Sequence, residues 1–202
     1  MATPPRYAII GSGNIGSALA GLFARAGVKV AIANTRGPES LRPLVASLGS
    51  GVRAVPLDEA LASEIILVAI PFTAVERFGA SVPDWTGKTV VDTTNAFLTP
   101  NAEEILRGRL SSHYFAEQFP GAEVVKAFNQ LPANTLAAEL DPATGKRVVF
   151  VATDSPEAGD RIAGLVEDLG LAAVQLGRID EGGRLIQARN ALVLRGFVEQ
   201  PL

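Results

Sequence analysis

Residues 8–20 read Ala8-Ile9-Ile10-Gly11-Ser12-Gly13-Asn14-Ile15-Gly16-Ser17-Ala18-Leu19-Ala20, and the fold prediction starts from them. The apolar run at 7–10 predicts a buried β-strand, because a short apolar segment bounded by glycine is typical of one. Residues from about 14 to 26 predict an amphipathic helix, and Gly27 follows it where a residue free to adopt positive φ is useful. A strand, a glycine-rich turn and a helix therefore follow one another directly.

Three glycines in this turn have the G-x-G-x-x-G spacing of a dinucleotide-binding loop. The first permits a tight turn, the second lets the backbone approach a pyrophosphate, and the third lets the helix pack closely on the strand. Free N–H groups and the positive dipole end of the helix then favour phosphates. A glycine-rich turn without a ligand is the alternative, but the preceding strand and following helix favour a dinucleotide. The residues expected at the pyrophosphate are Gly11, Ser12, Gly13, Asn14, Ile15 and Gly16.

The end of the second predicted strand, at 28–33, indicates which dinucleotide binds. NAD-specific sites usually carry an acidic residue about 20 positions past the glycines, which accepts hydrogen bonds from the ribose 2′-OH. Asn34 stands there instead, so no carboxylate would repel a 2′-phosphate. Thr35 can donate a hydrogen bond and Arg36 a charge-assisted one, with Ser40 as a weaker candidate. We therefore expect NADP, the alternative being that Arg36 is a solvated loop charge.

Strands and helices alternate along the rest of the chain, which predicts a mostly parallel sheet. We expect an α/β fold of the Rossmann type, doubly wound with helices on both faces, as a single domain over 1–202. A polar stretch at 96–110 interrupts the alternation, and Lys126 is expected to be paired or at a strand end. The remaining strands are expected at 52–55, 65–70, 89–92, 124–128, 148–152 and 172–176. The remaining helices are expected at 38–48, 57–62, 73–78, 112–118, 133–140, 157–169 and 184–198.

The composition excludes several function classes. Hydrophobic residues make up 48% of the 202 residues, enough to cover a sheet on both faces. With no cysteine and one histidine, thiolate or histidine-rich metal sites and a cysteine nucleophile are excluded. A net charge of −3 gives no electrostatic reason to expect nucleic acid or an anionic membrane. The apolar run at 65–72 is far shorter than the roughly 20 residues of a membrane span. With no signal-peptide pattern, a cytoplasmic protein is expected.

The chain resembles the NADP oxidoreductase family that includes the NADP reductases dependent on the deazaflavin coenzyme F-420. It is also similar to the oxidoreductase domain of the STEAP metalloreductases. The resemblance rests on five segments: 11–16, 33–40, 68–71, 90–95 (Val-Val-Asp-Thr-Thr-Asn) and 125–129 (Val-Lys-Ala-Phe-Asn). These segments span most of the chain, and the last two are more specific to the family than the first two.

The resemblance implies a hydride relay in which NADPH lies across the carboxyl ends of the strands. A second ring, coenzyme F-420 or the flavin FMN or FAD, would face the nicotinamide, and no catalytic side chain is expected. Asn129 stands where the deazaflavin reductases are expected to carry histidine, as in the metalloreductase-like members. The resemblance assigns Ile70 and Pro71 to the adenosine ribose and pyrophosphate, Thr93 and Asn95 to the nicotinamide side, and Ala127 and Asn129 to the nicotinamide and acceptor ring.

Two further functions stay open at this point. One is the NADPH-dependent reduction of a small imine or 2-oxo substrate, although relatives of that kind usually carry a long helical substrate domain. The other is a non-catalytic NADP-binding sensor, with the polar stretch as a partner surface. The partners expected are small-molecule cofactors, with no nucleic acid and no membrane. A homodimer is expected from the family and from the apolar final helix.

Overall fold

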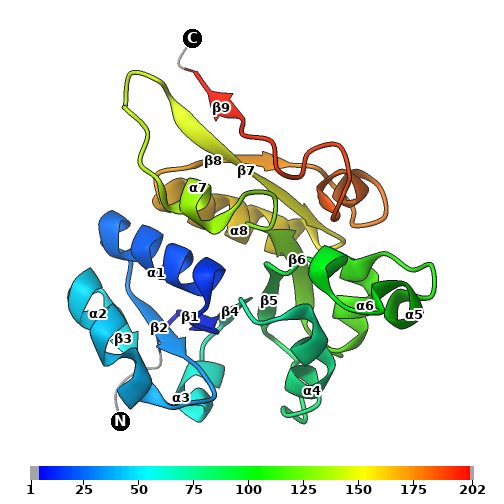
Figure 1. Ribbon diagram of the computed structural model, residues 1–202, viewed down its shortest axis with the longest axis horizontal. Helices are drawn as coiled ribbons and strands as arrows, with labels where there is room; N and C mark the ends of the chain where they lie inside the picture. Colours follow the sequence, from blue (N-terminus) through cyan, green and yellow to red (C-terminus); the bar gives the residue numbers. More distant parts are fainter. Residues whose placement is uncertain (1–4, 201–202) are drawn as a thin grey trace.

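The computed structural model describes residues 5–200, and of Leu98 only the backbone. Helices lie on both sides of a central sheet (Figure 1). Within these residues nine strands occur in the order β3-β2-β1-β4-β5-β6-β7-β8, with β9 paired to β7. This is the predicted Rossmann-type order, in which the strand sequence reverses between β1 and β4.

The first six strands are parallel to one another, and only the last three depart from that direction. β7 is antiparallel to β6, β8 is parallel to β7, and β9 is antiparallel to β7. The predicted mostly parallel sheet is thus confirmed. The strands are β1 Tyr7–Ile10, β2 Val30–Ala33, β3 Val52–Ala54, β4 Ile65–Val68, β5 Thr89–Asp92, β6 Glu123–Ala127, β7 Lys146–Thr153, β8 Ala172–Gln175 and β9 Val198–Glu199.

Both faces of the sheet are covered, and successive residues of the central strands β1, β2 and β4 are apolar and buried. Ile9 packs among α1, α2, α7 and α8, whereas Ile10 packs on the opposite face among α3, α4 and α6. Buried parallel strands need this continuous apolar character. The α-helices are α1 Asn14–Ala26, α2 Arg42–Leu48, α3 Leu57–Leu61, α4 Val75–Gly79, α5 Ala102–Leu106, α6 Ser111–Glu117, α7 Ala133–Ala137 and α8 Pro156–Asp168. Short 3₁₀ helices occupy η1 Pro38–Leu41, η2 Phe72–Ala74, η3 Ala96–Leu98 and η4 Gly182–Ile186.

The helix predicted at 184–198 is wrong. Only η4 is helical there, and the chain then runs irregularly to β9. Arg189 and Leu194 adopt left-handed backbone conformations, with φ of 67° and 60°, which interrupt a right-handed helix. The N–H of Leu194 instead donates to the carbonyl of Gln130 at 2.7 Å. The prediction of a homodimer therefore loses one of its two grounds, the apolar final helix.

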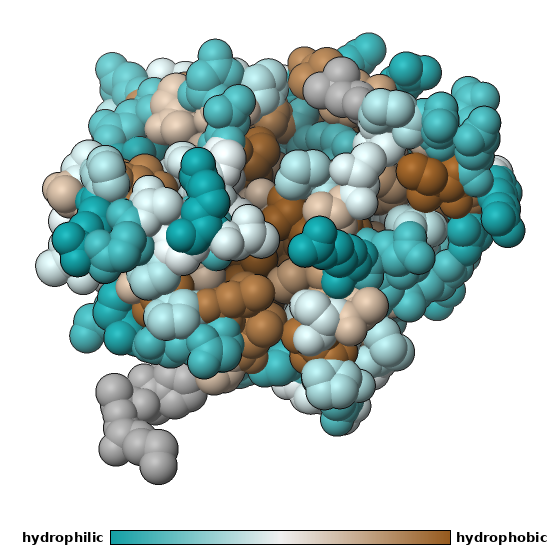
Figure 2. Space-filling model, turned by 60° about the horizontal axis from the view of Figure 1, so that its bottom comes forward, coloured by the Kyte–Doolittle hydropathy of each residue, from teal (hydrophilic) through white to brown (hydrophobic). Residues whose placement is uncertain are grey.

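The surface carries its apolar residues unevenly. Figure 2 shows hydrophilic side chains (teal) over most of one face and apolar side chains (brown) gathered along a hollow near its middle. Each helix within residues 5–200 is too short or too polar to cross a membrane.

The first expected helix is confirmed in full: α1 ends at Gly27, which has φ of 68°.

Candidate functional site

A crevice of about 660 Å³ opens at the carboxyl ends of β1, β4, β5 and β6. The chain leaves β1 toward β2 on one side, while β4 lies on the other side. Ligands of doubly wound sheets bind at this kind of switch point, because the loops diverge there and leave a crevice. The position of the crevice therefore follows from the strand order.

The glycine turn brings three backbone segments together at one end of the crevice. Gly11 has φ of 106°, and its N–H donates to the carbonyl of Ala33 at 2.8 Å. A Cβ on Gly11 would lie 2.3 Å from the carbonyl oxygen of Ala69 in the loop after β4. A Cβ on Gly16 would lie 2.0 Å from the carbonyl oxygen of Gly11. Any side chain at these two positions would push α1 away from the sheet.

Gly13 differs from these two glycines. It is the exposed N-cap of α1, and a Cβ there would have no atom within 4 Å. The first turn of α1 contains no acidic residue. Its N–H groups lack acceptors within the helix, and the dipole makes this end positive. The open space beside Gly13 and the unopposed amides fit a diphosphate.

The end of β2 is tied to the glycine turn by Asn34. Its Nδ2 donates to the Oγ of Ser12 at 2.9 Å and to the Oγ of Ser40 at 3.0 Å. Its Oδ1 accepts from the backbone N–H of Arg36 at 2.9 Å. Thr35 and Arg36 are exposed, and Arg36 forms no ion pair with a residue in 5–200. Asn34 thus orders the loop that presents Arg36 beside the turn.

The opposite wall contains two asparagines that bind each other. The Nδ2 of Asn95 donates to the carbonyl of Asn129 at 2.7 Å. The Nδ2 of Asn129 donates to the Oδ1 of Asn95 at 3.0 Å and to the carbonyl of Ile186 at 2.6 Å. Both hydrogens of Asn129 are therefore used. Its Oδ1 is buried and has no partner within the described part of the chain, so it is free to accept a hydrogen bond.

The residues predicted from the sequence fall into three groups. Those that line the crevice are Gly13, Asn14, Ile15, Ile70, Pro71, Thr93, Asn95 and Asn129. Those at the turn and the end of β2 are Gly11, Ser12, Gly16, Asn34, Thr35, Arg36 and Ser40. Ala127 forms the third group alone: it is 0% exposed within β6 and belongs to the core.

The sequence reasoning missed several lining residues. They are Ala69, Phe72, Thr73, Phe97, Thr99, Pro100, Leu131, Pro132, Ala133 and Leu194. Most of these follow the ends of strands or of η3, so their place after a predicted strand was a usable signal. Leu194 had no such signal. It reaches the crevice only because the C-terminal segment folds back onto the loop after β6.

The lining of the crevice is uncharged. Its described lining residues are glycine, alanine, proline, threonine, asparagine and larger apolar types, and none of them has an ionisable side chain. Tyr7 and Tyr114, whose pKa values are raised chiefly by burial, lie outside it. The crevice can bind and orient a ligand, but these side chains include no general acid or base.

A buried ion pair supports the loop at 93–95. The Nζ of Lys126 donates to the Oδ2 of Asp92 at 2.9 Å and to the carbonyl of Thr94 at 2.6 Å. The Oδ1 of Asp92 accepts from the N–H and the hydroxyl of Thr94, at 2.8 and 2.7 Å. Both side chains are at most 1% exposed. The expectation that Lys126 is paired is confirmed, and the pair fixes the backbone of one crevice wall.

Replacing Lys126 by Met should cost about 3–5 kcal/mol of the free energy of unfolding, because it leaves a buried carboxylate unpaired. Urea denaturation followed by circular dichroism measures this. Lys29→Met, at an exposed lysine, is the matched control and should change stability by no more than about 0.5 kcal/mol. Equal, small effects of both substitutions would contradict the structural role of the pair.

Two glycine substitutions should separate folding from binding. Gly16→Ala should destabilise the protein by about 1–3 kcal/mol, because its methyl group overlaps the carbonyl of Gly11. Gly13→Ala should lower the free energy of unfolding by about 1 kcal/mol or less. It should weaken the affinity for NADPH about tenfold or more, because its methyl group would occupy the space expected for the pyrophosphate. Thermal unfolding measures the stability of both variants, and fluorescence titration measures their affinity for NADPH. A Gly13→Ala variant that binds NADPH like the wild type would refute the assignment.

Comparison with known proteins places the chain in a family. The model of the family described as NADP oxidoreductase coenzyme F420-dependent matches residues 6–96, which include the glycine turn, Asn34 and Asn95. Metalloreductase STEAP3 of Rattus norvegicus is 30% identical over 177 residues, which cover 87% of this chain and 34% of that protein. The chain thus spans about a third of the length of this curated relative.

Two solved structures share the fold of the chain. The hypothetical protein SMa0349 from Sinorhizobium meliloti is 41% identical, with a TM-score of 0.91 over 97% of this chain and 96% of that one. A protein described as a putative F420 dependent NADP-reductase from Arthrobacter sp. FB24 is 24% identical, with a TM-score of 0.68 over 87% and 86% of the two chains. At that identity the second likeness shows the fold alone. The chain belongs to the family of coenzyme F420-dependent NADP oxidoreductases, a family of NADP-binding oxidoreductases.

Proposed function

We propose that this protein transfers hydride between NADP(H) and a ring acceptor, either the deazaflavin coenzyme F-420 or a flavin such as FMN or FAD. The observation that carries the proposal is the uncharged crevice, with a nucleotide-binding turn at one end. Hydride transfer between two rings requires close approach and alignment, and the cofactors themselves carry the chemistry. A crevice that orients two rings without an ionisable side chain suits this reaction.

Different residues would bind different groups of NADPH. The amides at the start of α1 and the open space at Gly13 would take the pyrophosphate. The guanidinium of Arg36, with the hydroxyls of Thr35 and Ser40, would bind the 2′-phosphate. The Oδ1 of Asn129 would accept a hydrogen bond from the carboxamide, since both hydrogens of its Nδ2 are already used. When bound, the nicotinamide supplies or accepts the hydride.

The lining also bears on the alternative of a small imine or 2-oxo substrate. Reduction of such a substrate adds a proton to nitrogen or oxygen, and enzymes usually deliver that proton from a positioned acid. None of the described lining side chains ionises, which favours a ring acceptor that exchanges its proton with solvent.

The homodimer and the cytoplasmic location expected from the sequence stay predictions.

Removing the guanidinium of Arg36 tests the choice of NADP. Arg36→Ala should weaken NADPH by about 1–3 kcal/mol and leave NADH nearly unchanged, because only NADPH offers a phosphate for the charge-assisted hydrogen bond. Fluorescence titration with both nucleotides measures this. Arg53→Ala, which removes an exposed arginine paired with Glu59, is the matched control and should alter neither affinity by more than about twofold. Equal losses for the two nucleotides in Arg36→Ala would overturn the assignment.

Hydride transfer itself is tested by following NADPH absorbance with a panel of acceptors. At least one of coenzyme F-420, FMN and FAD should give turnover, whereas 2-oxo acids and imines should not. Gly13→Ala, which should bind NADPH about tenfold more weakly or worse, is the control variant and should turn over correspondingly more slowly at an NADPH concentration below its Kd. Turnover restricted to an imine or oxo acid would replace the proposed acceptor. Tight NADPH binding with no turnover on any of these compounds would show a sensor instead.

A further inference from the structure

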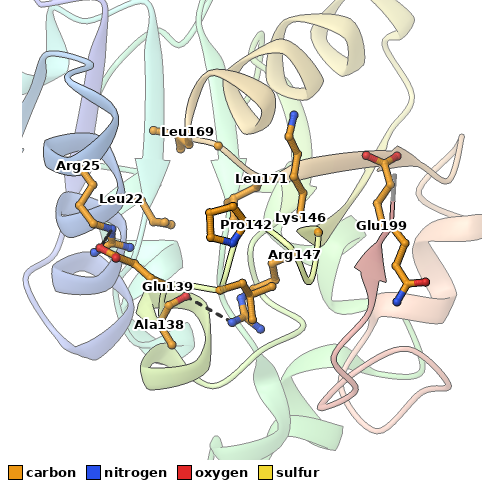
Figure 3. Close-up of a pocket in the computed structure, with 14 residues that line it drawn as sticks. Leu22, Arg25, Ala138, Glu139, Pro142, Lys146, Arg147, Leu169, Leu171 and Glu199 are labelled. Atoms are coloured by element: carbon orange, nitrogen blue, oxygen red, sulfur yellow. Dashed lines mark hydrogen bonds and ion pairs between the residues drawn. The ribbon is translucent and has the colours of Figure 1, made fainter. Parts of the chain in front are cut away.

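A second cavity, of about 510 Å³, lies apart from the crevice (Figure 3). It is bounded by the last turns of α1, the segment after α7, the start of β7, the junction of α8 and β8, and β9. None of the described residues that line it also lines the crevice. The cavity is therefore a separate site, and a ligand could bind there whether or not the proposed function is correct.

Arg147 is the buried cation of this cavity. Its side chain belongs to a residue only 8% exposed, at the start of β7. Its Nη2 donates one long hydrogen bond, 3.3 Å, to the carbonyl of Ala138, drawn as a dashed line in Figure 3. Its Nε is buried without a partner, and the guanidinium joins no ion pair among residues 5–200. A buried guanidinium is costly unless its donors are satisfied, so an acceptor is missing here.

The other charges around the cavity are already engaged or lie at its rim. Arg25 pairs with Glu139 at 3.3 Å and donates to the carbonyl of Ala137 at 2.8 Å. Lys146 and Glu199 are exposed and lie opposite each other where β7 pairs with β9. Three cations and two carboxylates therefore line the cavity, and the excess positive charge is that of Arg147. One negative charge on a ligand would balance it.

The remaining wall is apolar. Figure 3 shows Leu22, Pro142, Leu169 and Leu171 between Arg25 on one side and Lys146 and Glu199 on the other. We propose that this cavity binds a small organic monocarboxylate with an apolar body. The carboxylate accepts charge-assisted hydrogen bonds from the guanidinium of Arg147, whose planar donors suit a carboxylate. The apolar body packs on the leucines and the proline and is removed from water.

The first experiment uses hexanoate as the probe and hexanamide as its uncharged isostere, at constant ionic strength. Hexanoate should raise the Tm saturably and bind in isothermal titration calorimetry, whereas hexanamide should do neither. Arg147→Gln should weaken hexanoate about tenfold or more. Lys146→Gln removes the same charge one residue away and should change the affinity by no more than about threefold.

A second measurement keeps the proposal falsifiable if Arg147→Gln does not fold. In the wild-type protein, hexanoate should shift the ¹H–¹⁵N resonance of the Arg147 Nε, and it should leave the amides of Gly13 and Asn14 in place. Absence of that shift, equal binding of hexanamide, or undiminished binding by a folded Arg147→Gln would each overturn the proposal. Inorganic phosphate that binds as tightly as hexanoate would also overturn it, because the apolar body would then contribute nothing.

Discussion

The contact on which the rest of the site depends is the packing of backbone against backbone at the start of α1. The carbonyl of Gly11 lies where a side chain of Gly16 would be, and the carbonyl of Ala69 lies where a side chain of Gly11 would be. Because both residues lack a Cβ, the helix, β1 and the loop after β4 can approach to van der Waals distance. This approach points the positive end of a 13-residue helix into the crevice. It also leaves Gly13 as the open position beside that end.

The far wall of the crevice is built in a different way, from polar groups that satisfy one another. Asp92 and Lys126 form a buried pair that also holds the backbone of Thr94, and Asn95 and Asn129 exchange hydrogen bonds across two loops. Burying such groups costs solvation free energy, which these hydrogen bonds offset for every group named except the Oδ1 of Asn129. The result is a rigid surface whose charges are compensated beneath it, so that the crevice itself presents amides, hydroxyls and apolar groups. Such a surface can orient a ligand, and its described side chains offer no ionisable group.

The two halves of the crevice come from different parts of the chain. The glycine turn, the end of β2, the loop after β4 and residues 93–95 after β5 lie within the segment that matches the family model. Asn129, Leu131 and Leu194 lie beyond it, on the loop after β6 and on the C-terminal segment. The parts proposed to bind the pyrophosphate and the 2′-phosphate are thus separate in sequence from the parts at the other end of the crevice. Proteins of this fold can therefore change the acceptor side without disturbing the nucleotide turn.

The sequence alone determined the strand, turn and helix at 7–26, the parallel alternation of most strands and the missing carboxylate at Asn34. These features are encoded within a few residues, by hydrophobic period and by the stereochemistry of glycine, so local physics is sufficient to predict them. The tertiary structure decided that Asn34 bonds Ser12, that Lys126 bonds Asp92 and that Leu194 enters the crevice wall. It also overrode the apolar pattern that predicted a final helix, because the N–H of Leu194 bonds the carbonyl of Gln130, 64 positions earlier by their numbering. Contacts between residues so far apart depend on the packed sheet, and no local pattern contains them.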